Sequence, residues 1–338
     1  MDIKEINAAI TAIGGSAITA DKIKPIEVIP TGFSDLDDWV FGCGGLPRGK
    51  AIELYAKASV GKSTIGYNIL GKVQKNGGLC AVFDAEKALT AFYAKACGVD
   101  PTTLVVPDFA GGEDMLYKVK VFLALNIFDV ILIDSLNAIK PISTAWVNDP
   151  NMSEKLAAAR MWAQFFNSLD SGYKIKNSEN KIIPAQKTLQ ALDPDSDRFK
   201  QEQELHRLCD KKTSLICINH LMDKVGVSYG SKEYTPGGAR KEFIFFIRIA
   251  ASIAETKTGK KDGKEVLKYK TIKLKTKKNK LAPPLRSALF TLHPDGLLES
   301  CNKREEVDES EIEDHEEVEE EIVNNPKLSF LKDSLRSQ

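Results

Sequence analysis

Short apolar runs alternate with amphipathic stretches along much of this 338-residue chain. Apolar runs of strand length predict β-strands at 51–56, 79–84, 103–107, 129–134 and 214–219. Apolar residues at helical spacing predict helices near 62–76, 88–97, 113–126 and 153–169. Several of the strand-like runs are apolar throughout, which is typical of parallel strands covered on both faces. The pattern therefore predicts an α/β fold with a mainly parallel central sheet and helices on both of its faces.

The apolar positions follow a different rhythm after about residue 244. Runs at 245–253, 266–274 and 285–292 indicate antiparallel strands that finish the sheet. We interpret residues 31–298 as one core. A polar segment with two prolines, about 172–200, interrupts it as a surface insertion of unknown role.

Two segments flank this core. Four isoleucines at helical spacing predict a short amphipathic helix within residues 1–30, followed by a linker. Residues 299–338 are acidic, and we expect them to form a disordered tail.

The charges are unevenly distributed, although 47 basic and 47 acidic residues give no net charge. Between Glu305 and Glu321 there are 12 acidic residues and no lysine or arginine, which leaves 47 basic against 35 acidic residues elsewhere. A basic body with an acidic tail favours a polyanionic partner that the tail mimics or opposes. The alternative is a tail that serves solubility only.

Composition also bears on the compartment. The chain has no run of 18 apolar residues and its N-terminus lacks the build of a secretion signal, so we expect no membrane span. The six cysteines lack C-x-x-C spacing, which favours a reducing, cytoplasmic location without disulfides or zinc.

Residues 56–64 read Ala-Lys-Ala-Ser-Val-Gly-Lys-Ser-Thr, between a predicted strand and a predicted helix. This is the setting of a P-loop, in which backbone N–H groups and a helix N-terminus hold a phosphate chain. Lys62 would contact the outer phosphates, and the Ser63 hydroxyl would ligate magnesium. Ala56 stands where the motif opens with glycine, so the turn is either compatible with alanine or strained. A chance Gly-Lys-Ser sequence is the alternative.

Two predicted strands end in carboxylates. Asp134 ends one apolar run, where a carboxylate beside a P-loop holds a water of the magnesium shell. Asp84 and Glu86 follow another run, and Glu86 could orient and deprotonate an attacking water. The alternative is that Asp84 and Glu86 cap the following helix.

Two further segments suit nucleic acid. Residues 222–238 are a long loop with two tyrosines among glycines and lysines, a composition suited to stacking on bases. Residues 257–280 hold eleven lysines, which form either a solvated hairpin or a cationic surface for phosphates.

Together these features resemble the RecA family of DNA recombinases over about residues 28–298. Beyond the P-loop, the matching motifs are Thr31-Gly-Phe-Ser-Asp-Leu-Asp37, Gly44-Gly-Leu-Pro-Arg-Gly49, Asp84-Ala-Glu86, Ile133-Asp-Ser135, Leu156-Ala-Ala-Ala-Arg-Met161, Ile218-Asn-His220, Lys224-Val-Gly-Val-Ser-Tyr-Gly230, Pro236-Gly-Gly238 and Lys278-Asn-Lys-Leu-Ala-Pro283. So many motifs in one order are far more specific than a lone P-loop. The resemblance implies a RecA-type P-loop ATPase core.

The resemblance also implies an ATP site with Mg²⁺. Glu86 matches the family's catalytic glutamate, and Tyr93 falls where a tyrosine stacks on adenine. Lys278 and Lys280 match a lysine pair that reaches the ATP of the adjacent subunit. The remaining nucleotide-binding residues would be Ser59, Val60, Gly61, Lys62, Ser63, Thr64 and Asp134, with Ser63 and Asp134 on the metal side.

The segments 142–153 and 221–237 match the family's two DNA-binding loops. The expected DNA contacts are Arg160, Lys224, Tyr229, Gly237 and Gly238. The implied partners are single-stranded DNA, double-stranded DNA and further copies of this chain in a helical filament, built by docking of the N-terminal helix. Single-strand-binding and mediator proteins are further partners that such a filament would meet.

His220 departs from the bacterial pattern, in which a glutamine senses the γ-phosphate. The phage UvsX-type recombinases are similar to this chain there, also having Ile-Asn-His, which indicates a phage or otherwise divergent member. His220 could still donate a hydrogen bond to phosphate in the catalytic site, with a charge that depends on pH. The alternative is a buried histidine at a strand end.

The sequence thus predicts an ATP-dependent recombinase that coats single-stranded DNA and promotes homologous pairing and strand exchange. Two other functions stay open. One is a RecA-fold motor or regulatory ATPase without strand exchange, and the other is a DNA-binding filament or mediator that binds ATP with little turnover.

Overall fold

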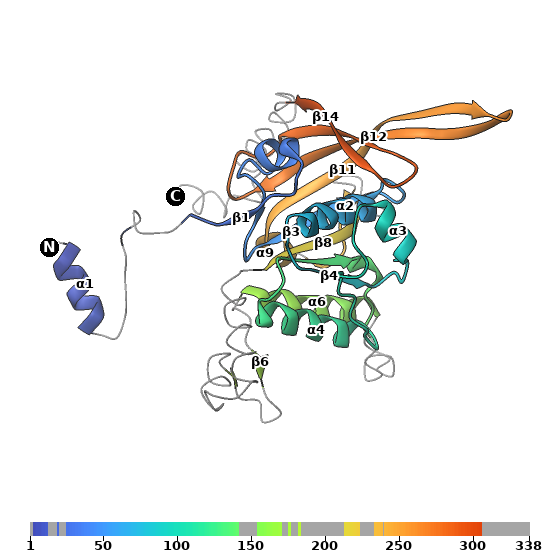
Figure 1. Ribbon diagram of the computed structural model, residues 1–338. Coiled ribbons are helices and arrows are strands. Elements are labelled where there is room, and N and C mark those ends of the chain that lie inside the picture. Colours follow the sequence, from blue (N-terminus) through green and yellow to red (C-terminus); the bar gives the residue numbers. More distant parts are fainter. Residues whose placement is uncertain are drawn as a thin grey trace, which may run out of the picture.

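The computed structural model describes residues 3–12, 19, 25–141, 154–170, 175–176, 182–183, 213–223, 233–238 and 240–305. Its main feature is an 8-stranded sheet (Figure 1). The neighbouring parallel strands are, in spatial order, β11 (Phe245–Lys261), β3 (Ala51–Ala56), β8 (Ser214–His220), β5 (Val130–Asp134) and β4 (Cys80–Asp84). On the other side of β11, the antiparallel strands are β12 (Lys264–Asn279), β13 (Ser287–Leu292) and β14 (Leu298–Glu305). This arrangement confirms the predicted fold class.

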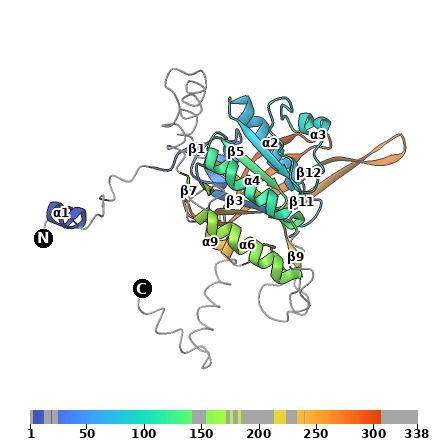
Figure 2. The same ribbon diagram turned by 90° about the horizontal axis from the view of Figure 1, so that it is seen from below.

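Helices cover both faces of the parallel strands. Helices α2 (Lys62–Lys75) and α3 (Ala91–Ala96) lie on one face, while α4 (Gly112–Leu125) and α6 (Glu154–Asp170) lie on the other (Figures 1 and 2). Two separate hydrophobic clusters result, one under each helical layer. The sheet is therefore the middle layer of a three-layer molecule.

Successive residues of β8 point to opposite clusters. Ile216 and Ile218 pack with α2, whereas Leu215 and Cys217 pack with α4 and α6. Since both faces are buried, the strand is apolar throughout its central part, as the sequence indicated. Full burial of each large aliphatic side chain contributes about 1.5–3 kcal/mol.

The predicted strands at 51–56, 79–84, 129–134 and 214–219 and the four predicted core helices are present within a few residues of the expected bounds. The predicted strand at 103–107 is wrong. Only Val105 pairs there, in an isolated parallel bridge to Ala81 at the edge of the sheet. Pro107 has no N–H to extend the ladder, and Val106 is half-exposed rather than packed.

The first two C-terminal strands, β11 and β12, are longer than predicted. β11 and β12 form a ribbon that projects well beyond the helices (Figure 1). Its turn is Asp262-Gly263, where both residues have positive φ (53° and 77°). β14 was not predicted because Leu298–Glu305 is mostly polar, and the expected core boundary at residue 298 falls at its start.

The smaller elements complete the described chain. They are α1 (Ile3–Ala12), β1 (Val28–Ile29) paired with β2 (Leu46–Pro47), the short helices η2 (Asp35–Val40) and η3 (Leu136–Ala138), β6 (Ile175–Lys176) paired with β7 (Ile182–Ile183), β9 (Met222–Asp223) paired with β10 (Glu233–Tyr234), and α9 (Arg240–Ile244). The helix predicted near the N-terminus is therefore present as α1. Across the described ranges, none of the helices has the length and apolar character needed to span a membrane.

Candidate functional site

The loop between β3 and α2 has the geometry of a phosphate-binding loop. Ala56 is the last residue of β3 and is buried with an extended backbone, paired with His220 of β8. The left-handed turns fall later, at Ser59 (φ 61°) and Gly61 (φ 107°). An added Cβ at Gly61 would come within 2.5 Å of Leu292. The position where the motif has its first glycine therefore accommodates alanine without left-handed strain, while Gly61 is required.

Lys62 begins α2, and its side chain turns back along the loop. The side chain is buried, and Nζ donates a hydrogen bond to Lys57 O at 3.0 Å. Burial lowers the pKa of Lys62, and the nearby Glu86 and Asp134 carboxylates partly oppose this. The ammonium thus lies among backbone acceptors and carboxylates at the N-terminal end of a helix, where phosphate oxygens are favoured.

Asp134 lies at the end of β5, beside this loop. Tyr67 Oη donates to Oδ2 at 3.2 Å, and Oδ1 is buried without a partner of normal hydrogen-bond geometry in the described part of the chain. Burial raises the pKa of Asp134 to about 6, although the nearby Ser63 hydroxyl opposes the rise. A buried carboxylate oxygen beside a hydroxyl is chemically suited to a hydrated magnesium ion.

Glu86 and His220 meet at the same edge of the sheet. Glu86 Oε1 accepts a hydrogen bond from Ser135 Oγ at 2.5 Å and lies 3.3 Å from His220 Nε2. Burial alone would raise the pKa of Glu86, but the hydrogen bonds from Ser135 and His220 outweigh it and lower this pKa. Glu86 is therefore held as a carboxylate, the form that a general base requires.

Asp84 has a different role from Glu86. Its carboxylate accepts hydrogen bonds from the backbone N–H groups of Ala88 and Leu89, at 3.2 and 2.8 Å. The following helix α3 is capped by Thr90, whose hydroxyl accepts from Tyr93 N. The alternative of a structural carboxylate thus fits Asp84, whereas Glu86 turns toward the other strand ends.

A cavity of about 370 Å³ is lined by the loop residues Ser59 and Gly61 to Thr64 together with Glu86 and His220, whereas Asp84 and Asp134 are not in its lining. Tyr93 lines it, half-buried, and its hydroxyl shares a 2.6 Å hydrogen bond with that of Thr64. Further residues line it from β12, from β13 and from the turn after β13: Leu267, Lys270, Leu292, His293 and Pro294. Of these, only Leu267 and Lys270 lie in the lysine-rich stretch 257–280, for which a cationic surface for phosphates is one interpretation. No local motif marks them, because only the sheet order brings these strands beside the P-loop.

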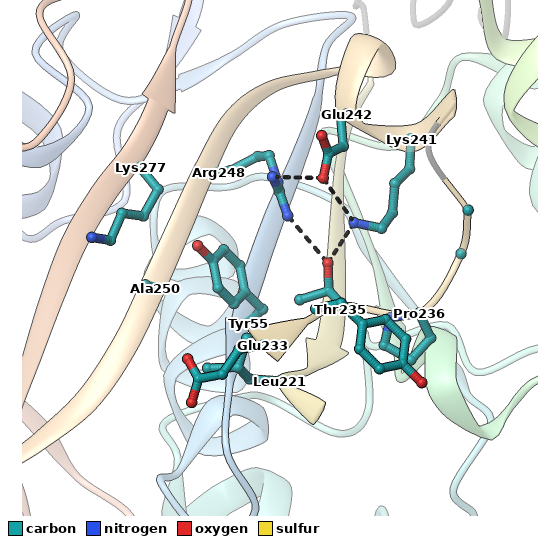
Figure 3. A pocket seen from close by; sticks show the side chains of 13 residues that line it. Tyr55, Leu221, Glu233, Thr235, Pro236, Lys241, Glu242, Arg248, Ala250 and Lys277 are labelled. Atoms are coloured by element: carbon teal, nitrogen blue, oxygen red, sulfur yellow. Dashed lines mark hydrogen bonds and ion pairs between the residues drawn. The ribbon is translucent and has the colours of Figure 1, made fainter. Parts of the chain in front are cut away.

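A second cavity, of about 720 Å³, lies between β3, β11 and the segment 233–238 (Figure 3). Tyr55, Arg248 and Lys277 line it together with Gly237 and Gly238. Both glycines have positive φ (113° and 74°), so the backbone there excludes most side chains.

A buried polar network supports this second cavity. Glu53 is completely buried and accepts from Arg248 Nε at 2.6 Å and from Asn219 Nδ2 at 2.8 Å, with Lys241 Nζ 3.7 Å away. Lys241 and Arg248 both donate to the Thr235 hydroxyl (Figure 3). Burial lowers the pKa of Lys241, and Glu53 opposes this. The network fixes the segment that contains the two glycines.

Asn219 connects the two cavities. Its Nδ2 also donates to Pro236 O at 2.8 Å, and its Oδ1 accepts from His220 N at 2.9 Å. One strand, β8, thus ends in adjacent residues of which one faces the P-loop cavity and the other holds the segment 233–238.

The other predicted residues lie apart from the P-loop cavity. Lys278, near the end of β12, and Lys280, just after it, donate to the backbone oxygens of Glu242 and Phe243. Arg160 is exposed on α6. Lys224 and Tyr229 lie outside the described residues, between β9 and β10.

Comparison with known proteins agrees with this geometry. The family model of the RecA N-terminal domain matches residues 3–187 and 201–297. "Protein RecA" of Saccharopolyspora erythraea is 34% identical over 268 residues, which cover 79% of this chain and 66% of that protein. "Protein RecA" of Chlorobium limicola is 31% identical over 303 residues, covering 86% of this chain and 73% of that protein. The chain thus spans roughly two thirds to three quarters of these relatives. These matches, together with the P-loop and the strand-end residues, show that the chain belongs to the RecA family.

Proposed function

We propose that this protein is an ATP-dependent DNA recombinase that forms a filament on single-stranded DNA and promotes homologous pairing and strand exchange. The observation that carries the proposal is the adjacency of the two cavities through β8. His220 faces the P-loop cavity, and the neighbouring Asn219 holds the segment that contains Gly237 and Gly238. A change at one cavity can therefore reach the other through two consecutive residues.

In this proposal, the loop residues 59–64 and Lys62 bind the phosphates of ATP. Glu86 is the general base: it is ionised, lies in the cavity and is oriented by Ser135 and His220. It would accept a proton from the attacking water, with His220 donating a hydrogen bond to the phosphate or to Glu86. Tyr93 would line the adenine side.

Mg²⁺ fits the remaining donors. Among the residues that the structure describes, no group of three or more His, Cys, Asp or Glu side chains is placed to hold a metal ion. The Ser63 hydroxyl and the unpartnered Oδ1 of Asp134 suit an ion that keeps waters and phosphate oxygens as its other ligands. When bound, the ion would neutralise phosphate charge.

DNA would be held by the second cavity and its flanking segments. The positive-φ glycines Gly237 and Gly238 let backbone N–H groups approach a phosphate closely, and Lys277 adds a positive charge to the lining, in which Arg248 is already paired with Glu53 and Glu242. Arg160, Lys224 and Tyr229 are the further DNA contacts that we propose. Double-stranded DNA would be the second substrate during pairing.

Filament formation would complete the ATP site. Lys278 and Lys280 do not line the P-loop cavity of their own chain, which is consistent with a role toward the ATP of a neighbouring copy. The amphipathic helix α1 would dock on the adjacent subunit.

The test is ATP hydrolysis by the full chain with and without single-stranded DNA, at low and moderate salt. Strong stimulation by single strands, followed by strand exchange in a joint-molecule assay, is the expected result. Turnover that is indifferent to DNA would favour a RecA-fold motor or regulatory ATPase, and electron microscopy would then reveal rings rather than filaments. ATP binding without turnover would favour the filament or mediator protein.

A further inference from the structure

The stem of the segment 224–232 contains an electrostatic conflict. Strands β9 and β10 pair on either side of this segment, and Asp223 lies directly opposite Glu233 in their register. Like charges directly opposite one another destabilise an antiparallel pair. The stem has only one further pair, Met222 opposite Tyr234, so a cation placed between the two carboxylates would stabilise it.

The P-loop supplies that cation. Lys57 follows Ala56 at the end of β3, and its Nζ lies 2.8 Å from Glu233 Oε1 and 3.7 Å from Asp223 Oδ1. One ammonium therefore contacts both strands of the stem. The hydrogen bond with Glu233, together with the charge of Asp223, raises the pKa of Lys57.

The backbone of Lys57 faces the other way, into the loop. Its carbonyl oxygen accepts the hydrogen bond from Lys62 Nζ at 3.0 Å. In the function proposed above, the same ammonium of Lys62 binds phosphate. If a bound phosphate drew Lys62 toward itself, Lys62 Nζ would no longer donate to the carbonyl oxygen of Lys57. The peptide group next to the Lys57 side chain would then be free to shift.

We propose that Lys57 is a positioning residue that transmits nucleotide occupancy of the P-loop to the β9–β10 stem, whose residues Glu233 and Tyr234 line the proposed DNA-binding cavity. This inference rests on the proposed function and assigns its regulation to a residue that no motif of the sequence singles out.

The two anchors of the segment have different character. Thr235 is fixed from the buried side by Lys241, whose side chain is only 2% exposed. The Lys57 anchor is open, with 59% exposure for Lys57 and 40% for Glu233. Open ion pairs form and break at little cost and weaken with salt, whereas the buried network stays fixed. Lys57 is therefore the anchor that can respond to the nucleotide.

The experiment compares the affinity for a labelled single-stranded oligonucleotide in the presence of a non-hydrolysable ATP analogue and of ADP, by fluorescence anisotropy. The ratio of the two dissociation constants measures the coupling. The variants are K57E, E233K and the charge-swapped K57E/E233K. K75E makes the same charge change at the exposed far end of α2 and serves as the matched control.

Lys57→Glu and Glu233→Lys are each expected to bring the ratio of the two dissociation constants about two- to fivefold closer to one. This effect should become smaller at high salt. The double variant should restore it and K75E should leave it unchanged. Since Glu233 lies outside the P-loop cavity, E233K should retain ATP affinity within about twofold. A ratio in both single variants equal to that of the parent chain would overturn the role of Lys57. A parent chain that binds nucleotide but not DNA would instead overturn the proposed function itself.

Discussion

His220 Nε2 lies 3.3 Å from Glu86 Oε1, although the two residues are 134 positions apart in the chain. They meet because β8 and β4 are parallel strands on either side of β5, so that their carboxyl ends reach the same edge of the sheet. Ser135, just after β5, holds the carboxylate between them. The candidate catalytic centre is therefore assembled from the ends of three neighbouring strands.

Replacing Glu86 by Gln should lower the rate of DNA-stimulated ATP hydrolysis by about 10²–10⁴-fold, because the amide can keep the contacts with Ser135 and His220 but cannot accept a proton. ATP affinity should change little. Steady-state hydrolysis and binding of a fluorescent ATP analogue measure the two effects separately. Unaltered turnover in E86Q would assign the base to another residue.

Asp134 should make stability depend on pH. Its folded pKa of about 6 lies above the ordinary value of 3.8, so its contribution is fully present below about pH 4 and is lost as the pH rises through 6. Relative to D134N, the parent chain without Mg²⁺ or nucleotide should lose on the order of 2–3 kcal/mol of unfolding free energy between pH 4 and pH 7. Urea unfolding at several pH values measures this loss.

The same variant should bind magnesium–ATP much more weakly, since it loses the negative charge beside Ser63. If D134N is more stable than the parent chain at pH 7 but binds nucleotide more weakly, Asp134 is a site residue kept at the expense of stability. Equal pH profiles for D134N and the parent chain would contradict this prediction.

Two glycine and alanine exchanges test the geometry of the P-loop. G61A should cost about 1–3 kcal/mol and remove most nucleotide affinity, because Gly61 has φ 107° and its Cβ would meet Leu292. A56G should leave nucleotide affinity within about twofold, since Ala56 is extended, and cost about 0.5–1 kcal/mol of stability. Thermal unfolding with and without ATP measures both. A gain of affinity in A56G would show that the alanine does strain the loop.

The buried network should respond unequally to removal of its members. E53Q leaves Lys241 and Arg248 without their buried carboxylate and should cost about 3–5 kcal/mol. K241M keeps the Glu53–Arg248 pair and should cost less than about 2 kcal/mol. Denaturant midpoints at constant slope give the comparison, and equal costs would mean that Arg248 alone does not satisfy Glu53.

Deleting residues 306–338 should tighten binding to single-stranded DNA at low salt and lower the magnesium requirement, because the deletion removes most of the acidic tract. The cut belongs after Glu305, whose carboxylate pairs with Lys273 in β12 at 2.5 Å. A neutral tail of equal length, made by Glu→Gln and Asp→Asn exchanges, separates charge from bulk. If neither the deletion nor the neutral tail alters the DNA affinity, the result would favour a tail that serves solubility only.

The parallel half of the fold could be predicted because its strands are buried on both faces and its helices keep a 3.6-residue period. β14 and the full length of the ribbon could not be predicted from hydrophobicity, since backbone pairing alone extends these strands beyond the apolar residues. A solvated hairpin is, however, one of the two interpretations of residues 257–280, and the ribbon confirms it. Asp262 and Gly263 form the turn of this hairpin, and an Asp-Gly pair favours such a two-residue turn. Residues of the candidate site that belong to a sequence motif, such as Lys62 and Glu86, could also be predicted from the sequence.

Site residues contributed by strands that are distant in the sequence could not be predicted. Lys270 donates to Ser59 O at 3.0 Å, but neither residue's neighbourhood in the sequence indicates the other. The register of β12 against β11 and β13 determines which lysine of that stretch reaches the P-loop. Likewise, Lys57 gains its partners only when β9 and β10 pair.

The β11–β12 ribbon gives the molecule a gradient of local stability. β13 pairs with β12 only from Lys270 onward, so the part between Lys257 and Tyr269 is a two-stranded hairpin without a third strand. Such hairpins are marginal by themselves, and amide protons should therefore exchange fastest at the Asp262-Gly263 tip and progressively more slowly toward the sheet. Lys270 marks the point where this fraying stops. The tip of the ribbon can therefore fray while Lys270, at its root, keeps the hydrogen bond to Ser59 O in the phosphate-binding loop.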